Sequence, residues 1–229
     1  MINVLSFLRP KPLLLDSVFN QVLSIGAIIE DTENPLPFEQ CPKFHVAILR
    51  DQIVGSIYAI NMNADLIETI NSYQTAVDQD EKNDIVNYTG MQFMKEEDVA
   101  LAFYYFLYEN GMSGWESFKM AVNENCWIEK NGKKYPVIGA IKKPAVITVA
   151  GKNFGTFDKL FLERLPRWQQ FIRIQQRIID PSMYYINWKE DKNLPSLLTC
   201  KERAGIEGVV THNAIEDAWD VIQLLRKQY

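Results

Sequence analysis

The amino-acid sequence predicts an α/β fold in which a mixed central sheet is flanked by helices. Three early segments have strand character, and helices alternate with strands in the rest of the chain. The chain has 229 residues, of which 47% are hydrophobic and 23% charged, the composition of an ordinary globular domain. We therefore expect a single domain over residues 1–229. The composition excludes a disordered, collagen-like or low-complexity protein.

The N-terminal part contains the three early strands. The apolar runs Leu13–Leu15 and Val22–Ile29 flank residues 16–21 and predict two strands joined by a tight turn. Residues 30–42 contain three prolines and predict a connection. Phe44–Leu49 then predicts the third strand.

The middle of the chain predicts two helices, Ala64–Tyr73 and Glu96–Glu109. The second has acids at its start and is followed by Asn110-Gly111, which is a typical stop signal. The acidic stretch Asp78–Asp84 between the two helices predicts a solvated loop.

Residues 111–143 are expected to form an insertion in the domain. Asn131-Gly132 lies between apolar flanks and predicts a hairpin within Trp127–Ile141. The β-branched run Ala145–Ala150 that follows predicts a buried central strand.

The C-terminal part predicts three more helices and a short strand. A helix is expected near Phe157–Leu165 and a strand at Ile178–Ile179. Leu194–Ala204 predicts a helix that ends at the glycine cap Gly205. The last helix, Ala214–Lys227, has apolar residues along one face.

The cysteines and the apolar runs indicate a compartment. Cys41, Cys126 and Cys200 are far apart, odd in number and without CxxC spacing, which argues against a disulfide framework or a cysteine zinc site. No apolar run reaches the roughly 18–20 residues of a membrane span, and the N-terminus lacks the features of a signal peptide. We expect a cytoplasmic protein without a membrane partner.

The net charge of −5 hides an uneven distribution. Between Lys130 and Arg177 there are 11 lysines and arginines against two acids, a local charge of +9, so the remainder carries −14 because 9 − 14 = −5. This basic block is either a solvated stretch or a surface that attracts a nucleic-acid backbone.

The start of the last helix carries a constellation suited to chemistry. Asn213 can cap the helix, with Glu216 three residues later. His212 then lies just outside the helix and Asp217 in its first turn, so both could face one cleft. The carboxylate suits a divalent metal, and the neutral imidazole suits a proton acceptor at pH 7. The alternative is that His212 is a helix-flanking surface residue.

Several segments resemble the motifs of the DEDDh 3′–5′ exonucleases, a family that includes the proofreading subunit of bacterial DNA polymerase, RNase T and oligoribonuclease. The pattern His-x-Ala-x-x-Asp-Ala at 212–218 resembles the third motif, residues 151–162 the second, and residues 22–28 the second strand. Residues 180–183 and 194–197 resemble the stretch between the second and third motifs. The resemblance implies an RNase H-like fold.

The resemblance also implies roles for individual residues. Asp16, Asp158 and Asp217 would be metal ligands, and His212 would be the base that deprotonates the attacking water. Two Mg²⁺ or Mn²⁺ ions, about 4 Å apart, would clamp the attacking and leaving oxygens of the phosphodiester. Carboxylates suit such hard cations. The alternative for Asp158 is an acid that stabilises the start of a helix.

The first motif of the family, Asp-x-Glu on the first strand, is where this sequence departs. One alignment puts Asp16 at the first acid and Val18 at the glutamate. Another ends the strand at residues 6–7, which puts Leu8 and Pro10 at the two positions and removes both carboxylates. Since neither valine nor leucine can coordinate a cation, we expect weaker metal occupancy and a large loss in rate.

Two functions follow from the resemblance. The first is a 3′–5′ exonuclease acting on single-stranded DNA or RNA, and the second is an impaired relative that binds nucleic acid or a protein without hydrolysis. The candidate nucleic-acid contacts are Asn153, Phe157, Lys142, Lys143 and Lys152. The aromatic side chains of the basic block either stack on bases or pack in the core; they are Phe154, Phe157, Trp168 and Phe171.

Overall fold

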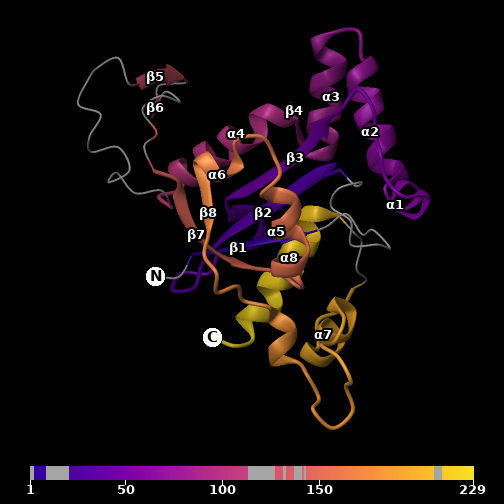
Figure 1. The fold of residues 1–229 in the computed structure, drawn as a ribbon, viewed down its shortest axis with the longest axis vertical. Helices are drawn as coiled ribbons and strands as arrows, with labels where there is room; N and C mark the ends of the chain where they lie inside the picture. The colour runs from indigo at the N-terminus through magenta and orange to yellow at the C-terminus, as the bar shows by residue number, and fades with distance from the viewer. Residues whose placement is uncertain are drawn as a thin grey trace.

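The computed structural model describes residues 3–8, 21–112, 127–130, 133–136, 141, 143–208 and 213–229. A six-stranded sheet lies at the centre of these residues, with the strand order β4-β3-β2-β1-β7-β8 (Figure 1). Its strands are β1 (Asn3–Leu8), β2 (Ser24–Asp31), β3 (Lys43–Leu49), β4 (Gln92–Lys95), β7 (Ala145–Ala150) and β8 (Ile172–Ile174). A separate antiparallel hairpin is formed by β5 (Trp127–Lys130) and β6 (Lys133–Pro136).

The sheet is mixed, as the sequence predicts. β1 is antiparallel to β2 and β2 to β3, whereas β7 is parallel to β1 and β8 to β7. β4 extends the other edge in parallel with β3. Three antiparallel strands early in the chain are therefore joined to later parallel ones.

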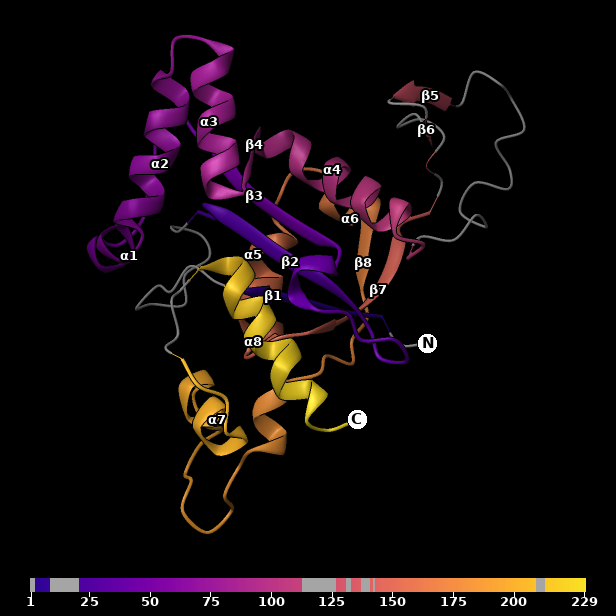
Figure 2. The ribbon, with the colours of Figure 1, turned by 180° about the vertical axis from the view of Figure 1, so that it is seen from behind.

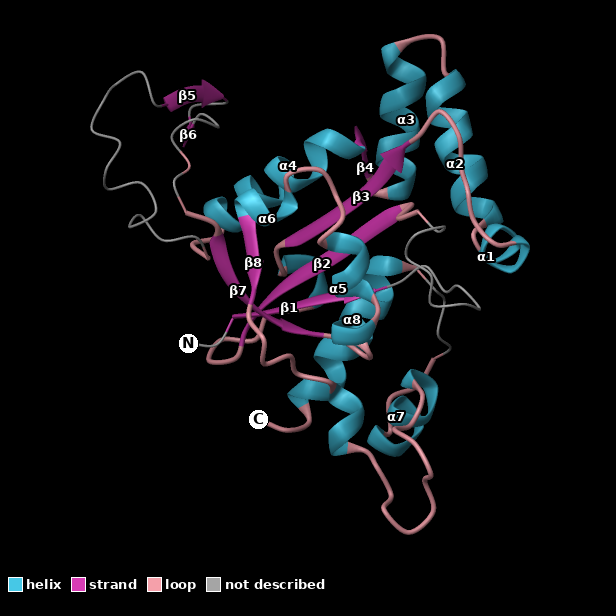
Figure 3. Cartoon of the chain, in the orientation of Figure 1, coloured by secondary structure: helices cyan, strands magenta, loops and turns pink. Residues whose placement is uncertain are grey.

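Helices cover both faces of the sheet (Figures 2 and 3). They are α1 (Ile57–Met62), α2 (Ala64–Thr75), α3 (Gln79–Thr89), α4 (Glu96–Glu109), α5 (Asp158–Leu162), α6 (Trp168–Phe171), α7 (Leu197–Ala204) and α8 (Ala214–Arg226). Side chains alternate along β2, so Ile25 and Ala27 pack with α4 whereas Ile28 packs on α8. Among the described helices, none is long and apolar enough to cross a membrane.

Most predicted elements are found where the sequence places them. The strands at 44–49 and 145–150, the helices at 64–73, 96–109 and 214–227, and the hairpin at 127–141 are confirmed, with ends that differ by a few residues. The helix expected from Leu194 begins later, at Leu197, because the Ser196 side chain caps it by accepting from the Thr199 amide at 3.1 Å.

The prediction of a loop at Asp78–Asp84 is wrong, because α3 begins there. The Asp78 carboxylate caps the helix by accepting from the Glu81 amide at 2.9 Å. Asp80 and Glu81 lie in the first turn, where the helix dipole favours negative charge. A run of acids after a capping residue therefore starts a helix here.

One strand prediction is untested and another needs correction. The strand expected at Leu13–Leu15 lies outside the described residues, and the strand that pairs with β2 is β1 at Asn3–Leu8. At the far edge the strand is β8, and Ile179 contributes only an isolated bridge to Ala150. The sequence analysis also missed three short elements, α1, β4 and α6.

His45 of β3 is expected to make stability depend on pH. Burial lowers the pKa of its imidazole from the usual 6.5 to about 4, although the nearby Glu216 carboxylate acts in the opposite direction. Between pH 6.5 and pH 4 the imidazole is therefore protonated in the unfolded chain but not in the folded one. The free energy of unfolding is highest above pH 6.5 and falls as the pH approaches 4, by on the order of 3 kcal/mol. Urea unfolding at pH 7 and pH 4.5 would measure this difference, which should shrink in His45→Gln.

Candidate functional site

The carboxyl ends of β1 and β7 meet at one edge of the sheet. The two strands are parallel, and Ser6 of β1 lies in register with Ala150, the last residue of β7. Leu8, at the end of β1, lies opposite Gly26 of β2. The residues that follow β7 therefore leave the sheet next to the point where β1 ends.

Helix α8 begins at this same edge. A Cβ atom on Gly26 would lie 2.4 Å from the carbonyl carbon of Ala214, so the two backbones are in direct contact. Asn213 caps the helix, and its side chain accepts from the Ile215 amide at 3.0 Å while its carbonyl accepts from the Asp217 amide at 2.9 Å. The predicted cap is confirmed, and it places Asp217 in the first turn of α8.

Asp158 and Asp217 are both buried near this edge. Asp158 is the first residue of α5, which follows β7 through a short loop, and its exposed fraction is 6%, against 2% for Asp217. The Oδ2 atom of Asp158 and the Oδ1 atom of Asp217 are shielded from solvent. Carboxylate oxygens are the ligands that hard divalent cations prefer, so the donor chemistry of these two residues fits such an ion.

The roles predicted for the site residues stay predictions, and several of these residues are not described. His212 and Asp16 lie outside the described residues, as do Val18 and Lys142. β1 itself has the sequence Asn-Val-Leu-Ser-Phe-Leu and carries no acid, in line with the alignment that ends the strand at residues 6–7. Among the described residues, no group of three or more histidines, cysteines and acids is placed to hold a metal ion.

Glu30 is a third buried acid, and it is held by the C-terminal end of α8. It lies on β2 and is 2% exposed, and its carboxylate receives two hydrogen bonds from Arg226, at 2.6 and 2.7 Å. The Tyr229 hydroxyl donates to it as well, at 2.8 Å. Arg226 is the last residue of α8, so Glu30 anchors the end of the helix remote from Asp217.

The loop between β7 and α5 is held by a carboxylate that sequence reasoning did not assign to the site. Asn153 has left-handed backbone geometry, with a φ of 57°, and its amide donates to Asp180 Oδ2 at 2.9 Å. The other oxygen of Asp180 accepts from the Ser182 amide at 2.9 Å. The ammonium of Lys152, 8% exposed, donates to Asn153 Oδ1 at 2.9 Å. Nothing in the sequence links Asp180 to Asn153, since 27 positions separate them.

The aromatic side chains of the basic block pack in the core. Phe157, a candidate nucleic-acid contact, is 5% exposed, and the alternative of core packing is confirmed for all four rings. Lys143 is exposed, as are four arginines of the block, Arg164, Arg167, Arg173 and Arg177. The side chains that this region exposes to solvent are therefore cationic, and its aromatic rings are buried.

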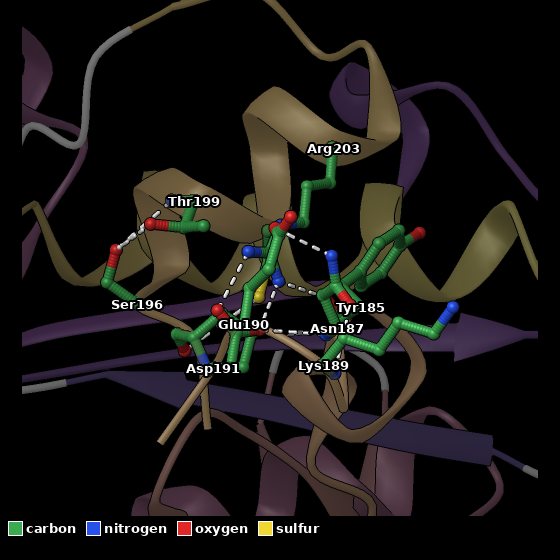
Figure 4. A network of polar contacts seen from close by, with 10 residues as sticks. Tyr185, Asn187, Lys189, Glu190, Asp191, Ser196, Thr199 and Arg203 are labelled. Carbon is green, nitrogen blue, oxygen red and sulfur yellow. Dashed lines mark hydrogen bonds and ion pairs between the residues drawn. The ribbon is translucent and has the colours of Figure 1, made fainter. Parts of the chain in front are cut away.

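A polar network fixes α7 beside α8 (Figure 4). Arg203 of α7 forms an ion pair with Asp191 and donates to the Tyr185 carbonyl at 2.6 Å, and the hydrogen bonds from Arg203 hold the pKa of Asp191 at about 2. The Tyr185 hydroxyl donates to the Leu224 carbonyl of α8 at 2.7 Å. These contacts brace the helix that carries Asp217.

The fold is similar to that of a known nuclease. The crystal structure of E. coli exonuclease I in complex with a dT13 oligonucleotide superposes with a TM-score of 0.51 at 13% identity, over 99% of this chain and 41% of that one. No family model and no curated protein matches the sequence. At this identity the likeness shows a nuclease-like α/β fold, and the chain spans less than half the length of exonuclease I.

Proposed function

We propose that this chain has an RNase H-like, exonuclease-type fold and binds the 3′ end of single-stranded nucleic acid where β1 ends. Asp158 and Asp217 would hold a divalent cation there, Mg²⁺ or Mn²⁺, which would offset the repulsion between the carboxylates and a phosphate. The observation that carries the proposal is the burial of both carboxylates at 6% and 2% exposure, on helices that begin at one edge of the sheet.

Hydrolysis by this site is proposed to be impaired. In the exonuclease family that the sequence resembles, the first strand supplies two metal ligands, whereas β1 supplies none. Catalytic groups that act as a unit lose most of their effect when one is missing. Binding without efficient turnover therefore fits the described residues best.

A second candidate is an active 3′–5′ exonuclease with a two-metal site. Asp16 would then be the third ligand, and His212 would take the proton from the attacking water. The two buried carboxylates favour this candidate, because carboxylate oxygens are the ligands that Mg²⁺ and Mn²⁺ prefer.

Metal-dependent binding tests the proposal. Fluorescence anisotropy with a single-stranded oligonucleotide should show affinity at least tenfold higher in Mg²⁺ or Mn²⁺ than in EDTA, with loss of this gain in Asp158→Asn and Asp217→Asn. Glu163→Gln is the matched control, because Glu163 is a half-buried acid next to α5 that pairs with Lys159. Equal affinity with and without metal would contradict the proposal.

The same samples separate binding from hydrolysis. With a 5′-labelled oligonucleotide, the impaired site predicts little shortening from the 3′ end after prolonged incubation in Mn²⁺. Progressive shortening that disappears in His212→Ala would establish the second candidate instead. DNA and RNA oligonucleotides of one sequence, run side by side, show which sugar is accepted.

A further inference from the structure

A polar cavity lies along the same edge of the sheet as the proposed site. It has a volume of about 410 Å³ and lies among the ends of β3 and β4 and the start of α4. This volume is within the range of small-molecule sites. The residues of its wall that matter here are Gln21, Arg50, Gln52, Gln74, Lys95 and Glu96.

The sheet topology relates this cavity to the candidate site. β1 and β3 point in the same direction, because each is antiparallel to β2. Their carboxyl ends therefore lie at one edge, two strand spacings apart, which is about 10 Å. At the ~3.4 Å rise per nucleotide of a stacked strand, this distance corresponds to about three nucleotides.

The wall of the cavity is held in place by Arg50. Its guanidinium forms two hydrogen bonds to the Glu96 carboxylate, at 2.9 and 2.8 Å, and a third to the Val22 carbonyl at 3.2 Å. Gln74 donates to the Arg50 carbonyl at 3.2 Å. The planar guanidinium is therefore fixed before any ligand arrives, which lowers the entropy lost on binding.

The chemistry of the wall suits a base better than a phosphate. Arg50 and Lys95 face three acids, Asp51, Glu96 and Glu97, so the lining carries a net charge of −1 (2 − 3). Such a cavity does not attract a phosphate. Side-chain amides both donate and accept, as the edges of unpaired nucleobases require, and Gln52 and Gln74 are exposed.

We infer that this cavity is a subsite for one nucleobase of the bound strand, about three nucleotides from the end held near Asp158 and Asp217. The inference rests on the proposed function. Amides of Gln52 and Gln74 contact the base edge, and the paired Arg50, whose side chain is 10% exposed, holds the wall in place. Strands that reach the cavity gain affinity that shorter ones lack.

Oligonucleotide length and an abasic scan test this inference. In Mn²⁺ the protein should bind an octanucleotide about tenfold more tightly than a dinucleotide, and one internal abasic position should remove that gain. Gln52→Ala combined with Gln74→Ala should lower octanucleotide affinity by about the same factor and leave dinucleotide affinity unchanged. In this double variant, an abasic position should no longer change octanucleotide affinity. Gln79→Ala, a glutamine of α3 outside the cavity, is the matched control.

Each outcome has a distinct meaning. If dinucleotide binding depends on metal but length and abasic position have no effect, the cavity is filled by water alone and the inference fails while the proposed function stands. If the double variant weakens dinucleotide and octanucleotide binding equally, the subsite is also excluded. If no oligonucleotide binds the unaltered protein, the proposed function fails and the inference falls with it.

Discussion

Replacing Gly26 with alanine is expected to lower the free energy of unfolding by about 3 kcal/mol and to displace the start of α8. The added Cβ would lie 2.4 to 2.6 Å from three backbone atoms, in Ala214 and Ile215. Backbone cannot rotate away as a side chain can, so overpacking of this kind falls at the upper end of its usual range. Chemical denaturation of the two proteins measures the loss.

The control for this substitution is Gly155→Ala. A Cβ at Gly155 would meet only the terminal methyl of Ile178, at 3.1 Å, which a small side-chain movement relieves. A change below about 1 kcal/mol is expected there. Gly26→Ala should also weaken metal-dependent oligonucleotide binding, because Asp217 moves with α8. If both variants unfold alike, α8 does not contact β2 as closely as described.

The sequence predicts α8 and its cap well because every signal for them is local. Asn213, the acids of the first turn and the apolar face lie within one helix length, so none depends on distant contacts. The strand at 145–150 is predicted for the same reason, since its β-branched run is unbroken. The candidate ligands Asp158 and Asp217 come from these locally determined segments.

The first strand shows where local signals are insufficient. Residues 3–8 include Asn3 and Ser6 and carry a weaker apolar signal than Leu13–Leu15, yet they form the strand that pairs antiparallel with β2. Register is decided by partners far away in sequence, which a single sequence does not display. The position of the first strand therefore depends on a contact that could not be predicted.

The cavity beside Arg50 could not be predicted for a related reason. Arg50 and Glu96 are 46 positions apart, and they meet because β3 and β4 are neighbours in the sheet. Neither residue belongs to a recognisable motif. A count of charges in the sequence also does not show which cations form ion pairs within the fold. Arg50 pairs with Glu96 and Lys201 with Asp220.

Removing the carboxylate of Asp220 is expected to destabilise the protein by about 3–4 kcal/mol. Its Oδ2 lies 2.7 Å from Nζ of Lys201, and the two side chains are 12% and 4% exposed. Asp220→Ala therefore leaves an ammonium buried between α7 and α8 without its counter-ion, which is costly. Thermal and urea unfolding would measure the loss. Arg203→Met, which breaks the more exposed ion pair of the same helix, should have the smaller effect.

The double substitution Lys201→Met with Asp220→Leu tests the reason for that loss. Two apolar side chains of similar size leave neither a buried charge nor a large cavity, so most of the stability lost in Asp220→Ala should return. A double variant as unstable as Asp220→Ala would mean that shape, rather than charge, holds α7 against α8.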